Sequence, residues 1–193
     1  KSPCCDGSTA IAARPAVSRA APVLVRAPAP GAGGGRGRAG ALTRSPAADE
    51  YRVNVTSDRQ VHTWTGTESI SLTNNSSTSM GTVWLHLWSN GVKGCRAHAI
   101  TVSRLVGGTA GIPILGCTSL PIHLSKPLAA NHVATLSMTV QIQLFHRNDR
   151  FGFNAGVVFL GTALPTLAVH DDHGWNLNPF VDIGESFYSL ASN

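Results

Sequence analysis

The chain has 193 residues, enough for one domain with a sizeable core, and its 15 Lys or Arg against 10 Asp or Glu give a formal charge of +5. The charge is unevenly placed, because residues 1–48 hold seven basic residues and one acid whereas residues 49–193 hold eight basic residues and nine acids. A nucleic-acid-binding domain carries its basic residues on the folded surface beside aromatic residues, and residues 1–48 contain no aromatic residue. The composition therefore argues against nucleic-acid binding, and no apolar run reaches the length of a membrane span.

Residues 1–48 are predicted to be a disordered tail rich in Ala, Pro, Gly and Arg. They hold six of the eleven Pro and none of the eight His. Such a segment buries too little apolar surface to offset its conformational entropy. The tail contains Cys4 and Cys5, which are either an unstructured pair or the remnant of a lipid-attachment site, although the Leu-containing context of such a site is absent. The folded domain is expected over residues 49–193.

From Tyr51 onward the hydrophobic pattern has the period of two that is typical of strands. Apolar and polar residues alternate at 51–55, 70–72, 83–87, 120–124 and 134–144. Clusters of Asn, Gly, Ser and Pro separate these runs, and no segment keeps a helical period for three turns. The sequence therefore predicts an all-β fold, either an antiparallel β-sandwich or an open β-saddle, preceded by the disordered tail.

Cys95 and Cys117 flank a segment with two turn signals, Gly107-Gly108 and Gly111-Ile-Pro113. A disulfide between them would stabilise the fold by roughly 3 kcal/mol and would indicate an extracellular protein. The alternative is two separate buried thiols. Zinc binding is not indicated, because His98 lies three residues after Cys95 but no second pair of ligands completes the site.

His170-Asp171-Asp172-His173 places two imidazoles and two carboxylates within four residues. Such a cluster is either part of a transition-metal site or a polar turn in which the Asp side chains accept hydrogen bonds from backbone N–H groups before Gly174. Near the end of the chain, Gly184-Glu-Ser186-Phe-Tyr188 lacks the second Gly of a nucleophile elbow, and the His-Glu-x-x-His pattern is absent. The sequence thus assigns no catalytic, cofactor-binding or metal-binding residue.

Residues 51–193 carry a series of short patterns in a fixed order. These are Tyr51-Arg-Val53, Trp64-Thr-Gly66-Thr with Ile70 and Leu72, Leu85-His-Leu-Trp-Ser-Asn-Gly91 leading into Ile100-Thr-Val102, Pro127-Leu before the longest alternating run, Arg150-Phe-Gly152, Leu160-Gly161 with Leu164-Pro165 and Leu167-Ala-Val169, Gly174-Trp175-Asn-Leu-Asn-Pro179, and Gly184-Glu-Ser-Phe-Tyr-Ser189. Their order and spacing resemble the N-terminal β-domain of zinc aminopeptidases of the aminopeptidase N family, in particular the secreted bacterial members.

The resemblance implies a twisted β-saddle that packs on a thermolysin-like catalytic domain and helps to close the active-site cleft. In that family the catalytic domain supplies the zinc ligands and the Glu that activates water. The chain lacks these patterns, so the resemblance implies a fragment that is incomplete at its C-terminus, with no cofactor of its own and with zinc in the missing domain. Relatives bind the substrate α-amine through an acidic or amide side chain of this domain; Asp171, Asp172 and Glu185 lie in the corresponding region but are equally explained as turn and surface groups.

The function expected from the sequence is therefore that of a non-catalytic N-terminal portion of a secreted or cell-surface zinc metalloaminopeptidase. Its partners would be the missing catalytic domain and a peptide substrate, and the chain alone would hydrolyse no peptide. The alternative is a free-standing extracellular β-sandwich that binds a surface polymer or protein through Trp64, Trp84, Trp88 or Trp175.

Overall fold

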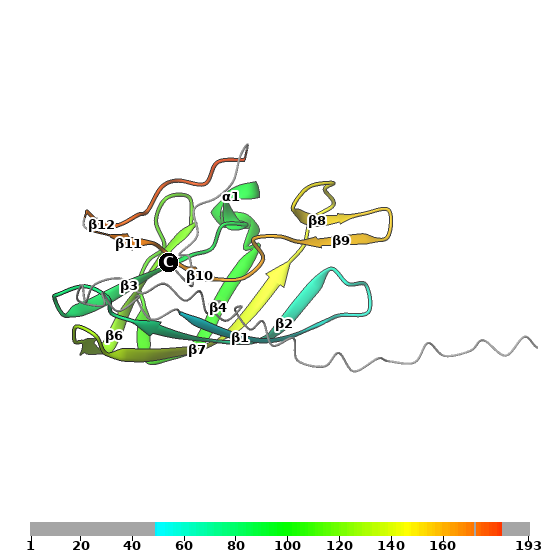
Figure 1. The fold of residues 1–193 in the computed structure, drawn as a ribbon. Helices are drawn as coiled ribbons and strands as arrows, with labels where there is room; N and C mark the ends of the chain where they lie inside the picture. Colours follow the sequence, from blue (N-terminus) through cyan, green and yellow to red (C-terminus); the bar gives the residue numbers. More distant parts are fainter. Residues whose placement is uncertain (1–48, 172, 183–193) are drawn as a thin grey trace, which may run out of the picture.

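A computed structural model describes residues 49–171 and 173–182 (Figure 1). The predicted tail with Cys4 and Cys5, and the pattern that begins at Gly184, lie outside the described residues. Within them the structure consists mostly of antiparallel strands, which confirms the all-β fold class. The described helices are a single turn each, α1 (Asn90–Lys93) and the 3₁₀ turn η1 (Cys95–Ala97). No helix in this part of the chain has the length and apolar character needed to cross a membrane.

Two four-stranded antiparallel sheets form the domain. The first has the order β1-β2-β7-β4 and contains β1 (Glu50–Ser57), β2 (Thr63–Thr73), β7 (Val133–Gln143) and β4 (Ile100–Val106). The second has the order β10-β3-β6-β5 and contains β10 (Thr166–Leu167), β3 (Met80–His86), β6 (Ser119–Leu128) and β5 (Gly108–Ala110). Two small ribbons lie at opposite ends of the molecule, β8 (Phe151–Asn154) with β9 (Val157–Leu160) and β11 (His170–Asp171) with β12 (Gly174–Trp175) (Figure 1).

The main hydrophobic core lies between the two sheets. The alternating run of β7 sends Leu136, Met138 and Val140 into it, while Ser137 on the opposite face pairs with Ser69 of β2 at 3.2 Å between the two hydroxyl oxygens. The second sheet contributes the buried side chains Val83, Leu85, Leu120, Ile122, Leu128 and Leu167. Each fully buried aliphatic side chain stabilises the fold by about 1.5–3 kcal/mol. The sandwich is thus held together by the period-two pattern of the sequence.

The two long sides of the sandwich differ. On one side the chain passes from β4 into β5 through Gly107, whose φ of 96° lets the strand turn from the first sheet into the second. The other side, between β1 and β10, is named here the open side. It is bridged by the hydroxyl of Tyr51, which accepts a hydrogen bond of 3.0 Å from the backbone N–H of Leu167.

Gly66 allows the close approach of β1 to β2. A Cβ at this position would overlap the backbone oxygen of Asn54 and would lie 2.6 Å from the Cα of Val55. Because backbone atoms cannot rotate away, Gly66→Ala is expected to push β1 from β2 and to lower the free energy of unfolding by about 2 kcal/mol. Urea denaturation measures this. The matched control is Gly81→Ala in β3, whose Cβ meets nothing within 4 Å and should change stability by less than about 0.5 kcal/mol. Equal effects of the two substitutions would contradict the prediction.

Candidate ligand pocket at the open side

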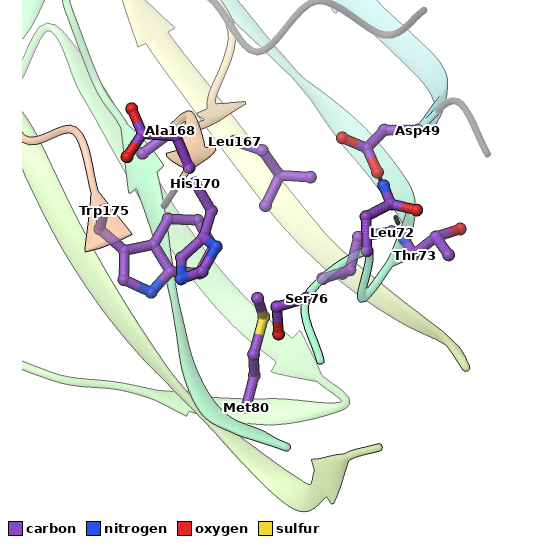
Figure 2. A pocket seen from close by; sticks show the side chains of 11 residues that line it. Asp49, Leu72, Thr73, Ser76, Met80, Leu167, Ala168, His170 and Trp175 are labelled. Atoms are coloured by element: carbon purple, nitrogen blue, oxygen red, sulfur yellow. Dashed lines mark hydrogen bonds between the residues drawn. The ribbon is translucent and has the colours of Figure 1, made fainter. Parts of the chain in front are cut away.

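A pocket of about 170 Å³ lies at the open side of the sandwich, beside the turn that joins β2 to β3. Its apolar lining comes from Leu72, Met80 and Leu167, and its polar lining includes Asp49 and Ser76. Figure 2 shows the rings of His170 and Trp175 together on one side of the pocket, with Asp49 and Thr73 on the opposite side. The pocket therefore combines hydrocarbon surface from both sheets with the carboxylate of Asp49, which precedes β1, and the imidazole of His170 in the ribbon of β11 and β12.

The turn between β2 and β3 is fixed by the buried amide of Asn74. Its Nδ2 donates to the backbone oxygens of Thr78 (2.7 Å) and Leu128 (2.8 Å), and its Oδ1 accepts from the N–H of Ser76 (3.0 Å). The hydroxyl of Ser76 donates to Asn74 Oδ1 at 2.7 Å. Because this hydroxyl is bonded within the turn, Ser76 is held as a wall residue of the pocket and is not paired with the nearby imidazole of His170.

The opposite wall is the ribbon of β11 and β12. His170 pairs with Trp175 across the ribbon, and the two rings meet edge to face with their centroids 4.8 Å apart. Asp171 Oδ1 accepts a hydrogen bond of 2.8 Å from the N–H of His173, and Gly174 follows with a φ of 103°. These are the contacts expected of the polar turn. Among the described residues, which exclude Asp172, no group of three or more His, Cys, Asp or Glu is placed to hold a metal ion.

A buried carboxyl group, that of Glu68, lies on β2 of the first sheet. The side chain of Glu68 is 1% exposed, and neither of its oxygens has a hydrogen-bond partner in the described structure. Burial raises the pKa of Glu68 to about 8, so the group is mostly protonated at neutral pH. Burial also raises the pKa of the Tyr51 hydroxyl well above its usual value. Glu68 was not singled out from the sequence, although its spacing from Ile70 and Leu72 places it on the same strand face.

The four tryptophan residues named for the alternative binding function lie at different places in the structure. Trp88 is 2% exposed, and its ring stacks on the buried imidazole of His86 with the centroids 3.9 Å apart. Burial lowers the pKa of His86, so this ring is neutral at neutral pH. Trp64 and Trp84 are partly exposed but belong to different sheets, and Trp175 belongs to the pocket wall. Trp88 is therefore a core residue.

Cys95 and Cys117 are joined by a disulfide in the structure, with their Cα atoms 5.1 Å apart. The bond connects η1 with the segment between β5 and β6. The amide of Asn90 supports the same connection, because its Nδ2 donates to the backbone oxygen of Cys117 (3.1 Å) while its Oδ1 accepts from the N–H of Ile100 (2.8 Å). This part of the chain is thus fixed by a covalent bond and by a buried side-chain amide.

No family model and no curated protein matches the chain.

Proposed function

We propose that the described domain is the non-catalytic β-domain of a secreted or cell-surface zinc aminopeptidase and that it shapes the peptide-binding cleft. One observation carries this proposal: four of the patterns that resemble the family converge at the open side. Tyr51 of the first pattern bonds to Leu167 of a later one, and Leu72 and Trp175 from two others line the pocket. Residues from both ends of the domain are thus brought together at one place.

The open side has the composition of a surface that packs against another protein domain. The pocket offers apolar side chains beside acidic and imidazole groups, and its wall at Trp175 is partly exposed. Contact with another domain would remove this apolar surface from water, which is the main driving force for domain packing. In this arrangement the catalytic domain supplies zinc and its ligands, and the β-domain supplies the shape of one cleft wall.

The proposal is tested by reconstitution in trans. The full chain is added to a zinc aminopeptidase of the family from which its own N-terminal β-domain has been deleted, and hydrolysis of leucine p-nitroanilide is followed. We expect a saturable increase in the rate that a zinc chelator abolishes. Trp175→Ala should raise the concentration needed for half of the effect by about tenfold, on the scale of a buried aromatic contact. The matched control Val133→Ala, an exposed residue at the start of β7, should leave it unchanged.

Two outcomes would contradict the proposal. One is zinc-dependent release of an N-terminal amino acid by the purified chain alone, which would make the chain a peptidase in its own right. The other is a rate of leucine p-nitroanilide hydrolysis that does not change at any concentration of added chain, which would remove the cleft-shaping role.

A further inference from the structure

We propose that β1 is the surface through which two copies of this chain associate, edge to edge, so that their first sheets join into one continuous antiparallel sheet. The proposal rests on the character of β1 and does not depend on the proposed function. In the described part of the chain, no strand pairs with the outer edge of β1. An edge of this kind presents a row of backbone N–H and C=O groups to a partner strand.

The other three edges of the two four-stranded sheets are each protected in a recognised way. β10 has two residues and β5 has three, which is too short to support extended pairing. β4 changes register between Ser103 and Val106, and Arg104 within this irregularity has a φ of 49°. Such a bulge twists the edge away from a partner strand. Among the edges of the two four-stranded sheets, short strands and a bulge therefore leave β1 as the one available for pairing.

β1 is regular throughout. It pairs with β2 over eight consecutive residues, Glu50–Ser57, without a register shift, and it contains no Pro. Its charged residues do not repel a partner strongly, because the guanidinium of Arg52 is paired with the carboxylate of Glu50 at 2.9 Å. The edge is thus uninterrupted and locally neutral.

A second copy of the chain is the partner that fits β1. In one antiparallel register, the residues on each face of the strand lie opposite residues on the same face of the second copy. When the two-fold axis passes through Val53, core-facing residues lie opposite core-facing residues. The facing pairs across the axis are then Val53 with Val53, Tyr51 with Val55, Arg52 with Asn54, and Glu50 with Thr56. Aromatic and β-branched residues are favourable opposite partners in antiparallel sheets, and no like charges face each other in this register.

Two neighbouring registers also place core-facing residues opposite core-facing residues, but both are less favourable. An axis at Arg52 would place the guanidinium groups of the two copies opposite each other, and an axis at Asn54 would place Glu50 opposite Asp58. A shift by one residue would exchange the core-facing side chains of one copy with the outward-facing ones of the other. Charge and side-chain alternation therefore select the register centred on Val53.

The association is measured by sedimentation velocity of the full chain after accessible thiols have been alkylated with iodoacetamide. We expect a reversible shift from 20.2 kDa toward twice that mass as the concentration rises. A Kd on the order of 10 μM is expected, because strand pairing alone gives a contact at the small end of the range for protein interfaces. A single 20.2 kDa species up to about 300 μM would overturn the proposal and would leave the edge for a strand of a different protein.

Substitutions at Asn54 test the register. This side chain is exposed and faces Arg52 of the second copy, so Asn54→Lys should weaken the dimer by about tenfold and Asn54→Asp should strengthen it by about threefold. Adding Arg52→Asp to Asn54→Lys should return the Kd to within about threefold of the original value, because each pair then joins opposite charges. Circular dichroism and thermal melting of each variant confirm that the fold is retained. A dimer with the same Kd in all variants would show pairing elsewhere and would overturn the assignment of β1.

Discussion

The free energy of unfolding is expected to fall as the pH rises from about 5 to 8, and Glu68→Gln is expected to remove most of this decrease. Burial raises the pKa of Glu68 from 4.5 in the unfolded chain to about 8 in the folded protein. Between these values the folded state keeps a proton that the unfolded state has released. The contribution of the Glu68 carboxyl to the free energy of unfolding is fully present below pH 4.5. It is lost progressively up to about pH 8 and is absent above that pH.

The expected size of the effect is large for a single side chain. Each pH unit within this window lowers the free energy of unfolding by about 1.4 kcal/mol, so the total is roughly 5 kcal/mol at most. At alkaline pH the native protein must either hold an unpaired carboxylate in its core or open the core to water. The second response would separate β2 from the sheet that covers it.

The measurement is urea unfolding at a series of pH values, followed by tryptophan fluorescence. Glu68→Gln keeps the size of the side chain but cannot ionise, so its difference from the original protein isolates the carboxyl group. Glu50→Gln is the matched control, because Glu50 lies on the neighbouring strand with a side chain 57% exposed, and its effect should stay within about 0.5 kcal/mol. Parallel pH profiles of the original protein and the Glu68 variant would contradict the prediction.

The strands were predictable because burial follows the period-two pattern. The run from Ala134 to Ile142 alternates in the sequence, and its apolar members Leu136, Met138, Val140 and Ile142 are buried in the structure. The same alternation in β2 also places Glu68 in the core, where composition alone would leave a carboxyl group on the surface. Periodicity determines the face of the sheet to which a side chain points. The free-energy cost of burying a polar side chain there depends on the neighbours that the opposite sheet provides.

The pocket was less predictable because it joins residues that are distant in the sequence. Asp49 and Trp175 line the same space, and the bond between Tyr51 and Leu167 connects strands of different sheets. Hydrophobic alternation does not specify which sheet a strand joins or which strands meet at an open side. The polar turn at His170 is local in sequence, and for this reason its hydrogen bonds could be anticipated from the residues alone.

Loss of the bond between Cys95 and Cys117 is expected to lower the free energy of unfolding by roughly 3 kcal/mol and the melting temperature by about 10 °C. The two residues are 22 apart in sequence, so the bond restricts a long loop of the unfolded chain. In the folded state Asn90 already holds the same segment to Ile100 and Cys117. Cys95→Ala with Cys117→Ala should therefore keep the native fold at low temperature and lose stability mainly through a freer unfolded state.

Calorimetry of this double variant gives the stability, and peptide mapping under non-reducing conditions identifies the bond. Cys4→Ala with Cys5→Ala is the matched control, because these residues belong to the tail predicted from the sequence and their replacement should shift the melting temperature by less than about 2 °C. A disulfide persists only where the surroundings are oxidising, so the bond between Cys95 and Cys117 agrees with the proposed secreted or cell-surface location. Free thiols at both positions in protein recovered outside the cell would contradict the disulfide and the stability prediction that rests on it.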